Sequence, residues 1–132
     1  MLPEFQTAIH QRLTTDAGLI AVVPADRIGN HVLDDAEFPH IDWRLEDIED
    51  GAIKSEESYE GSLILEVFSD YNGDLECYQI HQLLYTALQR NVLTVAGADN
   101  PHLTFNSLSI TTDDDNRTRQ ATINYSFMLG ES

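Results

Sequence analysis

The sequence predicts an α+β domain in which a mostly antiparallel sheet of four or five strands carries two amphipathic helices packed on one face. Two segments repeat apolar residues at intervals of three and four, a spacing typical of helices. Four other segments alternate apolar and polar residues, as half-buried strands do, and a fifth reads as a shorter edge strand. Most strand connections are hairpin-like, which favours antiparallel pairing and leaves the helices on one face.

The first helix is predicted over residues 3–15, with Pro3 in the first turn, where a proline is tolerated. The apolar stretch 19–23 is expected to form a brief helical turn against it. The second helix is predicted to follow a turn at 70–74, capped by Asn72 or Asp74, and to run to about residue 91. The expected buried positions are Phe5, Ala8, Ile9 and Leu13 in the first helix, and Cys77, Ile80, Leu83, Leu84, Ala87 and Leu88 in the second.

The strands are predicted from period-two alternation. A short edge strand is expected over 27–33, and the clearer strands cover 39–48, 59–69, 103–110 and 121–129. Between the last two, Asp113 to Asn116 reads as a hairpin tip. The apolar positions before that tip change parity at Asn106–Ser107, which predicts a β-bulge. No repeat or linker divides the chain, so residues 1–132 are expected to form one domain.

Two acidic segments, 46–60 and 111–120, are expected to project from this domain as a long connection and a hairpin. Repulsion among its carboxylates should keep part of the first segment extended and mobile. Long projections on a small domain often carry its contacts, although plain solvated loops are the alternative. The residues predicted to contact other proteins or to line a channel are Glu46, Asp47, Glu49, Asp50, Glu56, Glu57, Asp113, Asp114, Asp115 and Arg117.

The net charge of −16 is the most unusual property of the composition. Asp and Glu total 23 against 7 Lys and Arg, and Lys54 is the only lysine. Such a surface repels nucleic acids and anionic membranes at long range, which argues against binding through phosphate contacts. Solubility, adaptation to salt, and a surface that faces DNA without holding it all remain compatible with this charge.

The cysteine count and the apolar runs indicate the cellular compartment in which the protein folds. Cys77 is the only cysteine, so no internal disulfide forms, and its predicted place on a buried helix face favours an inert thiol. The opening residues resemble no secretory signal, and no apolar run reaches the length of a membrane span. We therefore expect a protein made and folded in a cytoplasm.

Catalytic and metal-binding patterns are not evident. The five histidines show no zinc spacing, and a single cysteine excludes a thiolate zinc site. The run from Asp113 to Asn116 lacks the glycine and the distant glutamate of an EF-hand loop, with Arg117 and Arg119 in place of later ligands. No nucleophile elbow, P-loop or dinucleotide fingerprint occurs. The sequence therefore predicts neither an enzyme nor a cofactor.

The overall pattern resembles the tail-terminator or tail-completion proteins, also known as head–tail joining or minor tail proteins, of long-tailed phages and gene transfer agents. The resemblance runs from about Phe5 to Leu129. It rests on apolar placement rather than on invariant chemical motifs. The segments that carry it are 5–13, 19–23, 26–28, 38–43 and 63–70, the helix positions Ile80, Leu84 and Leu88, and 119–127.

The resemblance implies a structural virion protein. Members of this family form a ring, usually a hexamer, that caps the head-proximal end of the tail tube and stops its growth. The implied partners are further copies of the chain, the tail tube protein and the head-completion or connector protein, while DNA passes through the lumen without specific binding. Assembly in the host cytoplasm would precede incorporation into the virion. An acidic DNA-mimic inhibitor of a DNA-binding protein is the main alternative, and a small hydrolase or metal protein is the third.

Overall fold

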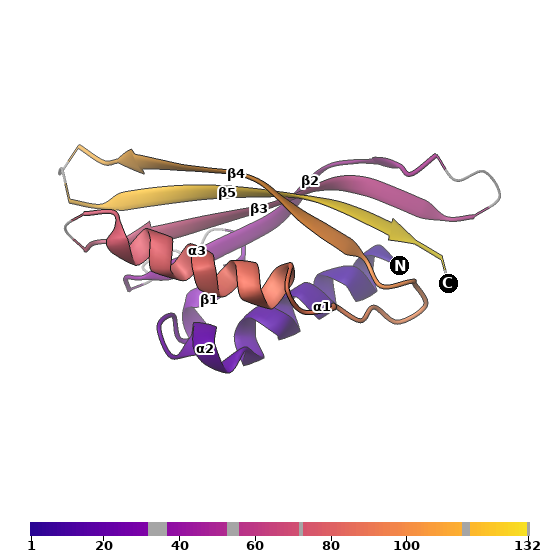
Figure 1. The fold of residues 1–132 in the computed structure, drawn as a ribbon, viewed down its shortest axis with the longest axis horizontal. Coiled ribbons are helices and arrows are strands. Elements are labelled where there is room, and N and C mark those ends of the chain that lie inside the picture. The colour runs from indigo at the N-terminus through magenta and orange to yellow at the C-terminus, as the bar shows by residue number, and fades with distance from the viewer. Residues whose placement is uncertain (32–36, 53–55, 72, 115–116, 132) are drawn as a thin grey trace.

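The computed structural model describes residues 1–31, 37–52, 56–71, 73–114 and 117–131. The chain begins with the long helix α1 and a few short elements, and the long strands follow with α3 among them (Figure 1). In chain order they are α1 (Leu2–Thr15), α2 (Ala17–Ile20), the 3-10 helix η1 (Ala25–Arg27), β1 (Ile28–Asn30), β2 (His40–Asp50), β3 (Ser58–Ser69), α3 (Leu75–Leu88), β4 (His102–Thr112) and β5 (Arg119–Gly130).

The strands form one sheet in the order β1-β2-β3-β5-β4. The α+β class and the five strands agree with the prediction, but the sheet is mixed rather than purely antiparallel, because β1 runs parallel to β2. Parallel neighbours require the intervening chain to return to the same end of the sheet, so this connection is not a hairpin. The predicted edge strand 27–33 is reduced to Ile28–Asn30, and residues 32–33 lie outside the described ones.

Three α-helices, rather than the two predicted, lie on one side of the sheet in the described part of the chain (Figure 1). The additional helix, α2, is the brief turn expected near residue 19. Its N-cap is Asp16, whose Oδ1 accepts from the Leu19 N–H at 2.9 Å. Asp74 lies at the N-cap of α3 but makes no side-chain cap hydrogen bond. Its carboxylate instead accepts from Arg119, 3.1 Å away. Asn72 lies outside the described residues.

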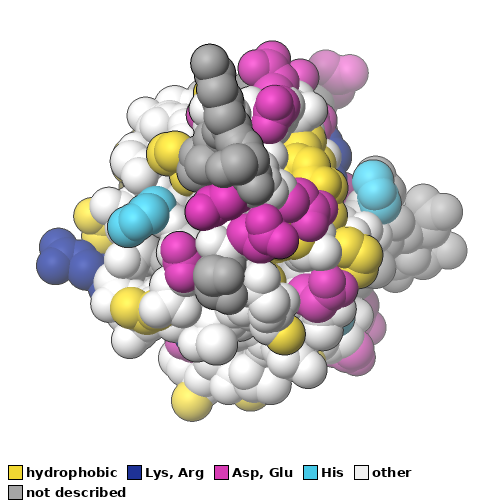
Figure 2. Space-filling view, turned by 90° about the vertical axis from the view of Figure 1, so that its right-hand side faces the viewer, with side chains coloured by type: hydrophobic (Ala, Val, Ile, Leu, Met, Phe, Trp, Pro, Cys, Tyr) yellow, Lys and Arg dark blue, Asp and Glu magenta, His cyan; other side chains and the backbone are white. Residues whose placement is uncertain are grey.

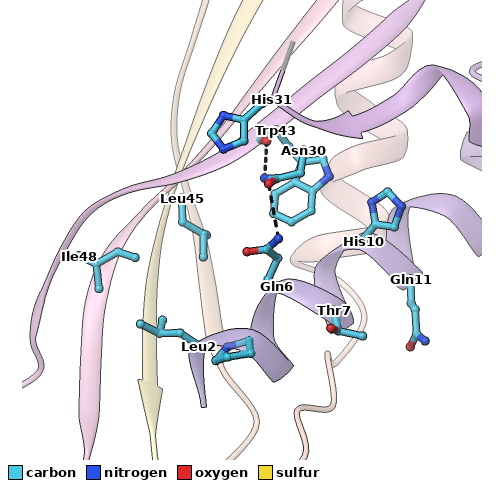
Figure 3. Close-up of a pocket in the computed structure, with 11 residues that line it drawn as sticks. Leu2, Gln6, Thr7, His10, Gln11, Asn30, His31, Trp43, Leu45 and Ile48 are labelled. Carbon is cyan, nitrogen blue, oxygen red and sulfur yellow. Dashed lines mark hydrogen bonds between the residues drawn. The ribbon is translucent and has the colours of Figure 1, made fainter. Parts of the chain in front are cut away.

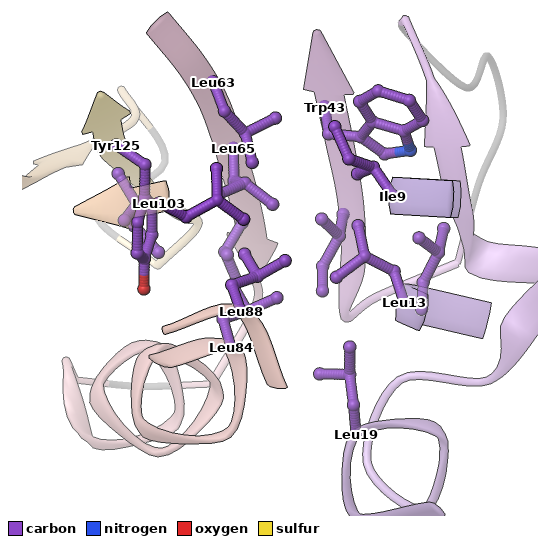
Figure 4. Packing of buried hydrophobic residues seen from close by; sticks show 14 of the residues in the cluster. Ile9, Leu13, Leu19, Trp43, Leu63, Leu65, Leu84, Leu88, Leu103 and Tyr125 are labelled. Carbon is purple, nitrogen blue, oxygen red and sulfur yellow. The ribbon is translucent and has the colours of Figure 1, made fainter. Parts of the chain in front are cut away.

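The core fills the space between the sheet and the helices (Figure 4). Trp43, Leu65 and Tyr125 are fully buried on the helix-facing side of the sheet, opposite Ile9 and Leu84 from α1 and α3. Full burial of one such side chain contributes about 1.5–3 kcal/mol to folding. The predicted helix stripes are mostly confirmed, since Phe5, Ile9, Leu13, Cys77, Ile80, Leu84, Ala87 and Leu88 are buried, whereas Ala8 and Leu83 are partly exposed.

Arg12 joins the first helix to the end of the third. Its Nη1 donates to the Ala87 carbonyl at 2.7 Å, and its Nη2 donates to the Val92 carbonyl at the same distance. The carbonyls at the end of a helix lack partners within it. Arg12 therefore satisfies a helix C-terminus with a charged donor and holds the following turn in place.

The β2 and β3 strands continue beyond the core as a projecting hairpin, named here the arm (residues 46–52 and 56–60). The predicted loop over 46–60 is wrong in extent, because β2 runs to Asp50 and β3 begins at Ser58. Cross-strand pairing explains the difference: Asp50 pairs with Tyr59, and β5 supports β3 as far as Ser58. A bulge interrupts β2 between Glu46 and Glu49.

The second long hairpin, β4–β5, reaches the opposite end of the molecule (Figure 1). Its register shifts between Phe105 and Ser107, which confirms the predicted bulge. Asp113 N–H donates to the Thr118 carbonyl at 2.9 Å and continues the pairing toward the tip. The two hairpins thus carry the two acidic segments to opposite ends of one sheet.

Candidate interaction surfaces

The arm holds six of the ten predicted contact residues and brings them to one end of the molecule. Seen from that end, Asp and Glu side chains gather on the surface (Figure 2). Asp47, Glu49 and Asp50 are exposed on β2, and Glu56 and Glu57 are exposed before β3. Glu46 is half-buried at the root of the arm. The sequence prediction that these carboxylates share a projecting surface is therefore consistent with their placement.

Few positive groups balance the arm. Arg44, at its root, donates to Glu46 and, at 3.0 Å, to Glu66 on the neighbouring strand. Glu57 Oε2 instead accepts from the Tyr59 hydroxyl at 2.6 Å, and this hydrogen bond, with the nearby carboxylates, raises the pKa of Tyr59. Glu49 and Glu60 pair directly across the strands, a like-charge contact that is unfavourable. The arm therefore projects negative charge that the described residues do not neutralise.

The remaining predicted contact residues lie at the other end. Asp113 and Asp114 are exposed, and Asp115 lies outside the described residues. Arg117 Nε donates to the Asp70 carbonyl at 2.9 Å. Together with the Arg119–Asp74 ion pair, this contact ties the β4–β5 hairpin to the start of α3. The structure thus separates the nine described residues of this set into two groups and does not bring them together into one site.

A groove that the sequence did not reveal runs between α1 and β2, beside the short strand β1 (Figure 3). Its volume is about 920 Å³. Side chains of Trp43, Leu45 and Ile48 on β2 face Leu2 and Gln6 on α1 (Figure 3). None of the lining residues is an aspartate or glutamate, in a chain that has 23; they are Leu2, Pro3, Gln6, Thr7, His10, Gln11, Asn30, His31, Trp43, Leu45 and Ile48.

One signal for the groove was present in the sequence. Ile48 interrupts the acidic run of the arm, and its side chain is 40% exposed. An apolar residue among carboxylates indicates a local contact, but no spacing rule pairs it with α1, which lies more than thirty residues earlier. Three further apolar side chains, Tyr71, Leu75 and Tyr78, are about half exposed near the start of α3.

The open face of the sheet, opposite the helices, contains a buried carboxylate. Asp42 is 2% exposed, and burial together with nearby Glu66 raises its pKa. Its neighbour on that face, His40, stacks on Phe68 with ring centroids 4.6 Å apart, and burial lowers the pKa of His40. These groups are spread along one strand face and do not converge on a cavity.

The other side chains that could take part in a reaction, Cys77 and His81, pack against the core. Cys77 is buried, and burial raises the pKa of its thiol to about 11, so the thiol is protonated at neutral pH and unreactive, as the sequence indicated. His81 lies against Phe105 with ring centroids 4.8 Å apart. Among the described residues, no three His, Cys, Asp or Glu side chains are grouped so as to hold a metal ion. No helix in that part of the chain is long and apolar enough to cross a bilayer.

These surfaces define a class of protein: a small α+β domain that presents strand edges, a neutral groove and two charged hairpins, which are surfaces suited to contacts between proteins.

The chain belongs to the family of tail completion protein gp17, whose family model matches residues 7–130. The resemblance inferred from the sequence is thereby confirmed, and the role is that of a structural component of the virion tail. No curated protein sequence matches the chain.

Two solved structures share the fold at low identity. A chain of the virion of a native gene transfer agent particle superposes with a TM-score of 0.79 and 18% sequence identity, over 95% of this chain and 93% of that one. The gp17 protein of bacteriophage SPP1 superposes with a TM-score of 0.62 and 18% identity, over 96% of this chain and 91% of that one. Both likenesses establish the fold.

Proposed function

We propose that six copies of the protein form a ring on the head-proximal end of the tail tube. The ring stops tube growth and joins the tube to the head connector, and DNA passes through its acidic lumen. Its partners are other copies of the chain, the tail tube protein and the head-completion or connector protein. The ring assembles in the host cytoplasm and then becomes part of the virion.

The observation that carries this proposal is the unbalanced negative charge of the arm in a tail completion protein. Asp47, Glu49 and Asp50 are exposed on β2, and no ion pair to them is present among the described residues. In a ring that directs the arms inward, these carboxylates would repel the phosphates of passing DNA. Repulsion in a confined channel keeps DNA from adhering while it moves.

The placement of the nine described contact residues supports two separate roles. The arm and the described end of the β4–β5 hairpin lie at opposite ends of the sheet, so these two ends face different surroundings in the ring (Figure 1). We assign Glu46, Asp47, Glu49, Asp50, Glu56 and Glu57 to the lumen. We assign Asp113, Asp114, Asp115 and Arg117 to the contact with the adjoining tube or connector ring.

The proposal is tested by electron microscopy of particles made without this gene. Overlong or headless tails are expected, because no ring stops the tube or receives the head. Normal infectious particles would contradict a tail role. Native mass spectrometry of the purified protein, alone and with tail tubes, then measures the number of copies. A monomer under both conditions that binds a basic protein would favour the DNA-mimic alternative.

A further inference from the structure

The two outer edges of the sheet differ in chemistry. On one side, β1 covers only Ile41 to Trp43 of β2, so the stretch Arg44–Asp50 has no strand partner on that side in the described part of the chain. On the other side, β4 pairs only with β5. Exposed edges of this kind accept further strands unless charge, proline or a bulge prevents it.

The free part of β4 has no charged side chains that would prevent another strand from pairing with it. Gln89 Oε1 accepts from the Phe105 N–H at 2.8 Å, so the open edge begins after this residue. The open stretch Asn106–Thr112 has seven residues and contains no charged side chain, although the chain has 23 carboxylates. Five of its seven side chains are hydroxyls or an amide, which all carry hydrogen-bond donors. Leu108 and Ile110, on the helix-facing side, are only half-buried.

The free part of β2 is complementary to this edge. Arg44–Asp50 also has seven residues, and Glu46, Asp47, Glu49 and Asp50 supply only acceptors. Next to it lies the groove, where Leu45 and Ile48 expose apolar surface that two half-buried side chains from another strand can cover (Figure 3). A strand rich in donors and free of charge can approach these carboxylates without like-charge repulsion.

Strand direction fits the same pairing. Because β2, β3, β5 and β4 are antiparallel in succession, β2 and β4 run in opposite directions. A second copy in the same orientation therefore presents its β4 antiparallel to β2. That copy has to be displaced along the strands, because the register places Leu108 level with Trp43, which β1 covers. Repetition of this contact is head-to-tail, and such contacts close into rings when the rotation between copies permits.

We propose that β4 of one copy adds as an antiparallel strand to the free half of β2 in the next copy, with Leu108 and Ile110 entering the groove between α1 and β2. The occupant of the groove is thus a second copy of this chain. This inference rests on the proposed ring, and it specifies the contact between its subunits.

Cysteine cross-linking tests the contact. Glu46→Cys is combined in turn with Ser107→Cys, Ser109→Cys or Thr111→Cys, all on the open face of the sheet, and the protein is oxidised under assembly conditions. At least one pair is expected to give a covalent ladder of several subunits on a non-reducing gel, because paired strands bring Cα atoms within about 4.4–6.8 Å. Glu46→Cys with Thr122→Cys, on the interior strand β5, is the matched control and should give none. Cys77 is buried and does not react.

Two cross-linking outcomes overturn the inference. A ring detected by native mass spectrometry without a ladder from any of the three pairs would show that the subunits meet elsewhere. A covalent dimer from Ser109→Cys alone would show that two β4 edges pair symmetrically.

Added charge gives an independent test. Ser109→Asp with Thr111→Asp places two carboxylates on an exposed edge opposite the acidic half of β2, and the assembled fraction should fall about tenfold or more. Ala17→Asp with Ala21→Asp adds the same charge at exposed positions around α2 and should leave assembly unchanged. Circular dichroism verifies that both variants fold. Equal assembly of the two variants overturns the interface but leaves the ring, whereas an unmodified chain that never assembles, even on tail tubes, overturns both.

Discussion

The arm and the β4–β5 hairpin both end in acidic residues, but they are held in different ways. The hairpin end is braced by arginines, since Arg117 reaches the Asp70 carbonyl and Arg119 pairs with Asp74. Along the arm, the nearest arginine, Arg44, lies at the root and pairs with Glu46, and no arginine pairs with a carboxylate beyond Glu46 among the described residues. One end therefore uses its charge for internal contacts, while the other displays it to the surroundings.

The largest expected effect concerns the root of the arm. Phe127 is 1% exposed on β5, and its ring lies 4.9 Å from that of Phe5 on α1. It also lies beneath Gly61 on β3, where a Cβ would come within 3.0 Å of the Phe127 ring. Phe127→Ala should lower the free energy of unfolding by about 3–5 kcal/mol, measured by urea denaturation.

Met128→Ala is the matched control for this variant. Met128 follows Phe127 on the same strand, points to the opposite face and is 52% exposed. It should change the free energy of unfolding by less than about 0.5 kcal/mol. Similar losses in the two variants would show that the arm does not rest on the core at Phe127.

A smaller effect is expected at the braced end. The Arg119 side chain is 14% exposed and pairs with an Asp74 side chain that is 47% exposed, so solvent screens part of the attraction. Arg119→Ala should cost about 1 kcal/mol of unfolding free energy. Removing arm carboxylates should not lower the free energy of unfolding by a comparable amount. An Arg119→Ala protein as stable as the parent would show that the hairpin end is not stabilised by its arginines.

A pH-dependent effect is expected in the layer beneath β4. Burial among aromatic rings lowers the pKa of His81 from 6.5, so the neutral form is favoured in the folded state. The resulting stability is fully present above pH 6.5 and is lost as the pH falls through 6.5 toward the folded-state pKa. His81→Phe should flatten the fall in unfolding free energy over that window.

The same measurement on His10→Gln provides the control, because His10 is exposed on α1. This variant should keep the pH dependence of the parent. A His81→Phe protein whose stability falls with pH as steeply as the parent's would assign the dependence to other groups, among them His40, whose pKa is also lowered by burial.

The smallest effect is expected from the arm itself. The triple variant Glu49→Gln, Asp50→Asn, Glu56→Gln removes three exposed carboxylates that make no described ion pair. Its denaturation midpoint should equal the parent's in about 500 mM salt and exceed it slightly in about 10 mM salt, where repulsion is least screened. A lower midpoint at either salt concentration would show that these carboxylates stabilise the fold.

The sequence predicted the elements whose apolar period is unambiguous. The alternation Ala121, Ile123, Tyr125, Phe127, Leu129 placed β5 with one buried face, and the parity change at Asn106–Ser107 located the bulge. The parallel pairing of β1 was missed, because a three-residue strand has no period to detect. The strands of the arm are not predictable from their period, because charge on both faces hides the alternation of a strand whose support comes from β3 and β5.

The interaction surfaces, like the strands, were predictable from the sequence only in part. Acidic composition indicated both projecting segments, since exposed carboxylates are visible in the sequence itself. The groove was not predictable, because Leu2 and Ile48 come together only through tertiary packing. The neutral character of β4 was present in the sequence from His102 to Thr112, but its meaning depends on β4 lying at the edge of the sheet.

The hydrogen bonds from Arg12 have a consequence for the order of folding during synthesis. The acceptors of its guanidinium lie 75 and 80 residues later in the chain. The helix α1 therefore remains without these acceptors until most of the chain has been translated, and contacts of such long sequence separation form slowly. During this interval its apolar face, with Phe5, Ile9 and Leu13, is available to chaperones.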